Sequence, residues 1–218
     1  MFIVNLLLFM GGFCALDSAL SRLGLEGVYY AVHTIHNAAM VYVTGHEVLQ
    51  TFTNFAGVSS APNNMIAVEL CFALHFYHCA YYWRKFRPDD WLHHGLMIGI
   101  ALPIGTFVHA GTLLGFSLFF TTGLPGGIDY FFLFLSRNGW CSREVEKRIN
   151  TALSVWIRSP GCVAQAALTV AYLSLQPQLP RYTVCAALLT AALNYWNGQY
   201  FMHQVVYDAG QRGIRDLC

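Results

Sequence analysis

Long apolar stretches leave few folds open to this chain. After the opening MFIVNLLLFMGGFCAL come six longer apolar stretches, residues 27–49, 65–83, 91–108, 112–135, 149–175 and 182–207. A helix rises about 1.5 Å per residue, so a stretch of roughly 20 residues crosses the hydrocarbon core of a bilayer. None of them shows the period-two alternation of an outer-membrane barrel strand. The sequence therefore predicts an all-α polytopic membrane protein, a bundle of six to seven transmembrane helices.

The composition supports this prediction. Only 11% of the 218 residues are charged, whereas a soluble domain carries about 25%. The net charge of +1 gives no reason to expect nucleic acid as a partner. The seven cysteines form no CxxC pair, so we interpret them as small buried side chains rather than disulfides or zinc ligands.

The first apolar segment, residues 1–16, has two interpretations. It lacks the basic residues that begin a secretory signal peptide, which favours a first membrane span over a cleaved leader. It is also short for a span, so the cleaved leader stays an alternative. No internal repeat divides the chain, and we predict a single transmembrane domain over residues 1–218 with its core at 27–208.

The loops between the predicted spans carry their positive charge on one side. Counting seven spans, Arg181 alone falls on the opposite side, and Arg158 lies within a span. The residues on the basic side are Arg22, Arg84, Lys85, Arg87, Arg137, Arg143, Lys147, Arg148, Arg212 and Arg215. Because basic loops stay in the cytosol, this asymmetry predicts a cytosolic C-terminus.

Polar side chains recur inside the predicted spans. Such groups are costly in lipid, so they are expected to face the interior of a bundle. Several are three or four residues apart and share a helix face. We expect the segments 121–127 and 158–161 to break their helices and border the same interior. The residues predicted to line this central cavity are His36, Asn37, His75, His78, Asn197 and Gln204.

The stretch DDWLHHGL opens one predicted span at its cytosolic end. One interpretation is a helix cap, since an acid after Pro88 suits a helix N-terminus. The other is a reaction centre, because Asp90 lies three and four residues before His93 and His94 and could orient either ring. The sequence leaves both interpretations open.

This arrangement resembles the TLC domain family of membrane proteins, which includes the translocating-chain-associated, longevity-assurance and ceramide synthase-like proteins. The resemblance rests on a basic loop followed by D-x-x-HH, on His36-Asn37, on a Gly-rich segment ending in Asp129, and on N-x-x-N-G-Q-Y near the C-terminus. It implies that His93 and His94 are catalytic and that Asp129 supplies the later acid. Ceramide synthases carry a His-Asp pair and a second Asp there, whereas this chain has one acid. It is therefore more similar to the small TLC-domain proteins, a group linked to phospholipid acyl composition, with the endoplasmic reticulum as its usual membrane.

Three functions follow as alternatives. The first is an acyltransferase that moves a fatty acyl chain from acyl-CoA, used as a co-substrate, to a lipid amine. In it Arg84, Lys85 and Arg87 would meet the CoA phosphates, although positive-inside anchoring is the more usual role of such a loop. The second is a non-catalytic regulator that binds membrane lipids in the same cavity. The third is a metal-dependent lipid oxidase, but the histidine spacing does not match such enzymes and we predict no metal site or tightly bound cofactor. A homo-oligomer is left open.

Overall fold

The computed structural model describes residues 1–212, and every regular element in this range is helical. This confirms the all-α prediction. The α-helices are α1 (Phe2–Arg22), α2 (Val28–Thr53), α3 (Met65–Tyr82), α4 (Pro88–Leu96), α5 (Leu102–Phe107), α6 (Thr112–Leu118), α7 (Leu124–Arg137), α8 (Arg143–Leu153), α9 (Ser159–Ser174) and α10 (Arg181–Gln211). Two 3₁₀ segments, η1 (Phe55–Ser60) and η2 (Trp83–Lys85), and three π-helical turns, η3 (Met97–Ala101), η4 (Phe119–Gly123) and η5 (Ser154–Arg158), complete the set.

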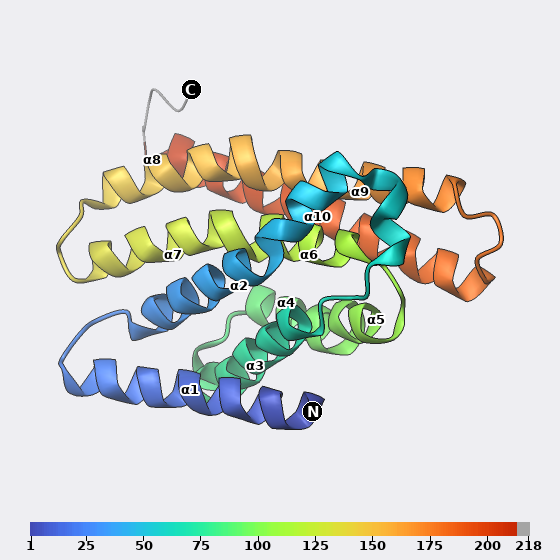
Figure 1. Cartoon of the computed structure of the whole chain (residues 1–218). Helices are drawn as coiled ribbons and strands as arrows, with labels where there is room; N and C mark the ends of the chain where they lie inside the picture. The colour runs from blue at the N-terminus through green and yellow to red at the C-terminus, as the bar shows by residue number, and fades with distance from the viewer. Residues whose placement is uncertain (213–218) are drawn as a thin grey trace.

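The π-helical turns join neighbouring helices end to end. Because α4 and α5, α6 and α7, and α8 and α9 are continuous through η3, η4 and η5, the described chain forms seven helical rods. Figure 1 shows that successive rods run in opposite directions along a common axis. Each rod covers nearly all of one predicted apolar stretch, but the first continues from the predicted residue 16 to Arg22, and the rod of α8 and α9 begins at Arg143 rather than at residue 149.

Three prolines explain the π-helical turns. A proline inside a helix lacks the N–H and its ring clashes with the carbonyl four residues earlier. Each of these carbonyls lies within a wider π turn, which moves it away from the ring. The prolines are Pro103, Pro125 and Pro160, and the residues four positions before them are Gly99, Thr121 and Trp156. The predicted helix breaks at 121–127 and 158–161 are therefore wrong, since the helices continue through them.

The main hydrophobic core lies between α1, α2 and α3 and includes Val32, Met40 and Tyr77, all fully buried. Polar contacts add to it, because Asp17 on α1 accepts hydrogen bonds from the hydroxyls of Tyr77 and Tyr82 on α3. The N-terminal segment is thus an integral part of the bundle core.

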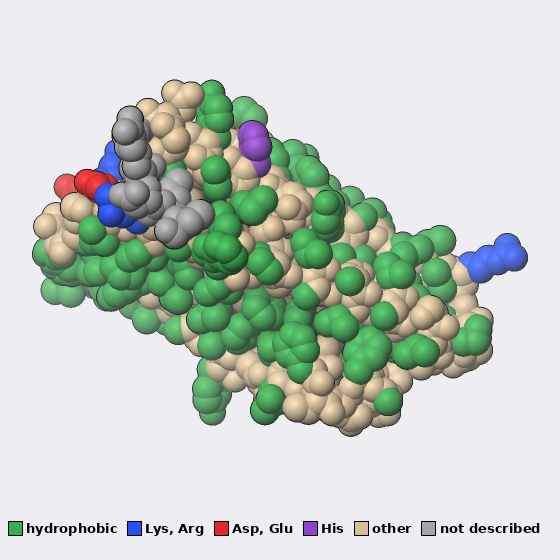
Figure 2. Space-filling view, turned by 90° about the horizontal axis from the view of Figure 1, so that it is seen from above, with side chains coloured by type: hydrophobic (Ala, Val, Ile, Leu, Met, Phe, Trp, Pro, Cys, Tyr) green, Lys and Arg blue, Asp and Glu red, His purple; other side chains and the backbone are tan. Residues whose placement is uncertain are grey.

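Two rods are long and apolar enough to cross a membrane by length and composition, Phe2–Arg22 and Thr112–Arg137. Large hydrophobic side chains are also exposed on many helices, among them Tyr42, Phe107 and Leu188. Figure 2 shows hydrophobic side chains over much of one face, with a cluster of charged side chains at one end and a basic side chain projecting at the other. The six or seven predicted spans therefore stay a prediction, while the helical rods that would form them are present.

Candidate functional site

Four histidines meet where α3 packs beside α4. His78 Nδ1 lies 3.2 Å from His94 Nε2, and His75 Nε2 lies 3.4 Å from His93 Nε2. The two predicted pairs therefore come together as two hydrogen-bonded imidazole pairs, one ring of each pair on either helix. His94 is buried with His75 and His78, whereas His93 is half-buried.

Backbone carbonyls decide which nitrogen of these rings carries hydrogen. A carbonyl only accepts, so the Nδ1 of His75 donates to the Cys71 oxygen at 2.7 Å, and the Nδ1 of His94 donates to the Asp90 oxygen at 2.7 Å. In the neutral rings their Nε2 atoms are then acceptors. His93 consequently donates from Nε2 to His75, and His78 donates from Nδ1 to His94. The remaining nitrogens, His93 Nδ1 and His78 Nε2, carry free lone pairs.

These two lone pairs differ in access. His78 Nε2 is buried and has no hydrogen-bond partner among residues 1–212. His93 Nδ1 likewise makes no hydrogen bond within the described part of the chain, but its ring is half-buried. Of the two rings, that of His93 is thus the more exposed.

An aromatic wall from α2 and α7 covers the histidines. His33 stacks on His78 with ring centroids 4.3 Å apart, and the centroid of the Tyr130 ring lies 4.1 Å from that of His33. Tyr29 contacts both rings of the stack, at 4.2 Å from His33 and 4.8 Å from His78. Sequence reasoning missed the two tyrosines as site residues. Tyr130 directly follows Asp129, but nothing in the spacing signals that its ring reaches the stack.

Asp90 does not orient an imidazole with its carboxylate, so this part of the sequence interpretation is wrong. Its Oδ2 accepts a hydrogen bond from the backbone N–H of Arg87 at 2.9 Å and lies 3.5 Å from the Arg87 Nε. The carboxylate therefore closes the first turn of α4, and only the Asp90 backbone carbonyl contacts His94. The reason is local, because the N–H groups at a helix start have no partner within the helix.

His36 and Asn37 are buried on α2. The Nδ1 of His36 donates to the Asn37 Oδ1 at 2.8 Å, and this oxygen also accepts from the Thr122 hydroxyl at 2.9 Å. Asn37 thus ties α2 to the π turn η4, beside Gly126, at which an added Cβ would lie 2.8 Å from the Asn37 Nδ2. The pair holds the α2–α7 contact that positions the aromatic wall.

Asp129 is buried on α7, and its Oδ1 makes no hydrogen bond among residues 1–212. Arg158, in the π turn η5, is close enough for its positive charge to act on both Asp129 and His93. The Arg158 Nε is buried and also lacks a partner in the described chain. Neither Asp129 nor Arg158 is hydrogen-bonded to His93 among the described residues, and Arg158 adds a permanent positive charge that acts on both. Arg158 was not predicted as a site residue, although an arginine within an apolar stretch is a signal for one.

On α10 the predicted cavity residues are not the buried ones. Gln204 is exposed and Asn197 is only half-buried, so the prediction is wrong for Gln204. Asn194 is buried instead, and it donates to Gln165 of α9 at 2.8 Å. The polar side of α10 therefore faces α9 rather than the histidines.

The basic loop before α4 is exposed, as a site for phosphate groups requires. The guanidinium of Arg84 lies 5.2 Å from the Trp83 ring and the Nζ of Lys85 lies 5.5 Å from the Tyr82 ring. The Nε of Arg87 lies 3.5 Å from the Asp90 Oδ2. All three charges are thus accessible on the side where α4 begins.

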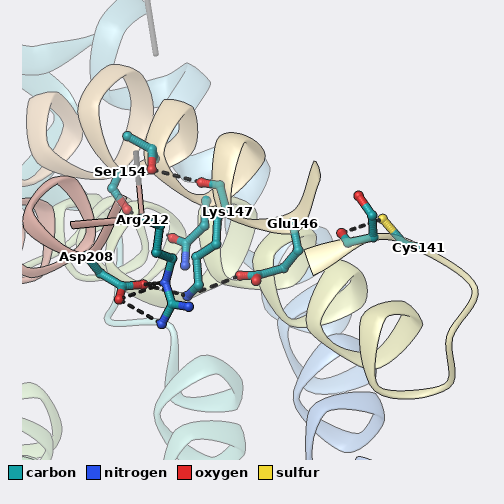
Figure 3. A network of polar contacts seen from close by, with 9 residues as sticks. Cys141, Glu146, Lys147, Ser154, Asp208 and Arg212 are labelled. Carbon is teal, nitrogen blue, oxygen red and sulfur yellow. Dashed lines mark hydrogen bonds and ion pairs between the residues drawn. The ribbon is translucent and has the colours of Figure 1, made fainter. Parts of the chain in front are cut away.

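A second polar group ties α8 to the end of α10. Lys147 Nζ lies 3.7 Å from Glu146 and 3.4 Å from Asp208, and Arg212 lies 3.0 Å from Asp208 (Figure 3). The hydrogen bond from Arg212, aided by Lys147, lowers the pKa of the Asp208 carboxyl. Asp208 therefore stays ionised and holds both cations at this end of the bundle.

No group of three or more His, Cys, Asp or Glu side chains within residues 1–212 is arranged to hold a metal ion. The ring nitrogens of the histidine pairs face each other rather than one common point. The metal-dependent alternative thus gains no support from the geometry.

No model of a known protein family, no curated protein and no solved structure matches the chain. The resemblance to TLC-domain proteins therefore stays a prediction from the motifs.

Proposed function

We propose that the chain is a multi-pass membrane protein that transfers a fatty acyl group from acyl-CoA to a lipid amine, as TLC-domain acyltransferases do. The observation that carries this proposal is the half-buried His93. Its Nε2–H is directed to His75, which leaves the Nδ1 lone pair free for proton transfer. A neutral imidazole fixed in one tautomer is the usual general base of acyl transfer.

In the proposed reaction the amine nitrogen attacks the thioester carbonyl while His93 Nδ1 takes one of its protons. The C–N bond forms, the C–S bond breaks, and the proton passes to the sulfur of the departing CoA. Negative charge develops on the carbonyl oxygen in between. Arg158, whose charge acts on the same region, would stabilise that oxygen. The exposed Arg84, Lys85 and Arg87 would meet the CoA phosphates.

A non-catalytic lipid-binding regulator is the second candidate. It is favoured by the buried polar atoms without partners, since His78 Nε2 and Asp129 Oδ1 suit a bound polar group as well as a reacting one. Lipid binding alone would not require His93.

The test of the acyltransferase is a comparison of lipids in cells that express the chain or its His93→Ala/His94→Ala variant. We expect the intact chain to change the amount or acyl composition of an N-acylated lipid by several-fold, and the variant to leave the lipids unchanged. Protein levels of both are measured by immunoblot. Equal lipid changes from both at equal protein level would favour the regulator instead.

We propose that the rods span the endoplasmic reticulum membrane with the C-terminus in the cytosol. The antiparallel rods bring Arg22, the loop 83–87 and the loop 138–142 to the same end, called the basic end below, and Arg181 begins α10 at the other. Arg215 lies outside the described residues. A tag at the C-terminus should be accessible from the cytosol, and one inserted in 54–64 should be protected until the membrane is permeabilised. Tags accessible from the same side would contradict this topology.

A further inference from the structure

A pocket with a volume of about 450 Å³ opens at the basic end, between the start of α2, the last turns of α7 and the start of α8. Its size is within the usual range for small-ligand sites, roughly 300 to 1,000 Å³. Asn138 fixes one wall, since its Nδ2 donates to the Glu26 carbonyl at 2.9 Å and its Oδ1 accepts from the Glu26 N–H at 3.1 Å. The pocket is therefore built by contacts between segments far apart in the chain.

The lining carries charges of both signs. Arg137, Arg143 and Lys147 contribute three cations, while Glu26 and Glu146 contribute two carboxylates. Arg137 and Arg143 are exposed, and the Arg137 guanidinium lies 5.7 Å from the Tyr30 ring. Glu146 is 1% exposed, and its Oε1 makes no hydrogen bond among the described residues. This oxygen lies 3.7 Å from the Nζ of Lys147, so the buried carboxylate pairs with that cation and Glu26 is the accessible acid of the pocket.

Residues on α7 and α8 lead from the pocket toward the histidine site. Asp129, Leu133 and Ser136 share one face of α7, because they are four and three residues apart. Leu133 and Ser136 line the pocket, and Asp129 lies one turn deeper, where the charges of Glu146 and Lys147 still act on it. Asn150 on α8 and Ser154 at the start of η5 are buried and hydrogen-bonded to each other, one and two turns beyond Glu146. A polar strip thus leads inward from the pocket toward Asp129 and Tyr130.

We propose that this pocket binds the headgroup of a lipid that carries both a phosphate and a positively charged amine. A phosphate alone would face Glu26, and an amine alone would face Arg137 and Arg143, so the mixed lining fits a zwitterion. Arg137 and Arg143 receive the phosphate, and Glu26 receives the amine. The inference rests on the proposed function and deepens it, because it names the class of lipid amine that the chain would bind before the amine moves to His93.

Binding is measured by calorimetry on the purified full chain in maltoside detergent, without acyl-CoA. The probes are dihexanoyl phosphatidylethanolamine, dihexanoyl phosphatidic acid and the water-soluble glycerophosphoethanolamine. We expect the phosphatidylethanolamine to bind about tenfold more tightly than either of the others, since only it offers phosphate, amine and acyl chains together. Equal affinity for phosphatidic acid would overturn the assignment of the amine. Equal affinity for the soluble glycerophosphoethanolamine would overturn the assignment of a lipid as the ligand.

Two variants separate the two halves of the headgroup. Arg143→Gln should lower the affinity for phosphatidylethanolamine and for phosphatidic acid about tenfold, whereas Glu26→Gln should lower only the affinity for phosphatidylethanolamine. The matched control is Arg148→Gln on the same helix, because Arg148 pairs with Glu144 and does not line the pocket. Thermal unfolding confirms that each variant is folded. Unchanged binding by a folded Arg143→Gln and a folded Glu26→Gln would overturn the site.

Failure of the proposed headgroup site can be distinguished from failure of the proposed acyl transfer. The His93→Ala variant should bind the phosphatidylethanolamine with the affinity of the intact chain, because His93 does not line the pocket. Binding without any acyl transfer by the intact chain would leave the headgroup site standing and remove the proposed reaction. Acyl transfer to lipids that lack a phosphate, at the same rate as to phosphatidylethanolamine, would leave the proposed reaction standing and remove the headgroup site.

Discussion

Replacing His93 with alanine is expected to lower the rate of acyl transfer by about 10²- to 10⁴-fold, the usual contribution of a positioned general base. The loss follows from removing the Nδ1 lone pair, which the hydrogen bond to His75 keeps free. The rate is measured on the purified full chain as release of the CoA thiol together with transfer of a radiolabelled acyl group to lipid.

Two matched variants test whether the loss belongs to this ring. Asp90→Asn should retain nearly the full rate, because the Asp90 side chain only closes the helix start and an amide oxygen there can accept the same hydrogen bond from the Arg87 N–H. His203→Ala should also retain it, since His203 is exposed on α10. A His93→Ala protein that is folded and transfers acyl groups at the rate of the intact chain would remove His93 from the reaction.

His75 acts through His93 as a positioning residue, so its loss should be smaller and partly reversible. His75→Ala removes the acceptor for the His93 Nε2–H and frees the other tautomer, which blocks Nδ1 with hydrogen. His75→Gln offers an amide oxygen to the same N–H and should recover part of the rate, together with the pH profile of the intact chain. A purely structural role of His75 would change protein stability and leave the pH profile of the folded variant unaltered.

Much of the fold could be predicted because its determinants are local. An apolar stretch of sufficient length predicts a helix wherever it lies, and spacings such as His75 to His78 predict a shared face without knowledge of the partner helix. The approach of α3 to α4 then follows from the short loop between them. The π turns could not be predicted from the same rules, since Pro125 predicts a disturbed helix but not whether the turn breaks or widens.

The errors in the site have a common physical cause. Asp90 has two possible partners within one turn, and the unpaired N–H of Arg87 is nearer than the imidazole of His94. The rotation of α10 about its axis depends on contacts with α9, so the burial of Asn194 in place of Gln204 cannot be deduced from spacing alone. Likewise, nothing local brings Tyr130 onto His33, because they lie on different helices.

The largest loss of stability is expected from Gly111→Ala, at the turn between α5 and α6. Gly111 has φ +55° and ψ −137°, and an added Cβ would run into the backbone carbonyl of Val58. This contact cannot relax, because Asn63 fixes the turn: its Oδ1 accepts from the N–H groups of Ala110 and Gly111 at 2.8 and 3.0 Å, and its Nδ2 donates to the Val108 oxygen at 2.8 Å. Strain and collision together should lower the free energy of unfolding by about 3 kcal/mol or more. The unfolding temperature in detergent should then fall by roughly 6 to 12 °C.

Gly139→Ala separates the two causes of this loss. Gly139 also has a positive φ, +73°, but no atom outside its immediate neighbours lies within 4 Å of an added Cβ. It should therefore show only the cost of the left-handed backbone, about 1 to 2 kcal/mol. The difference between the variants measures the collision with the Val58 carbonyl. Equal unfolding temperatures for the two would mean that η1 moves freely away from the α5–α6 turn and that Asn63 does not hold the segments together.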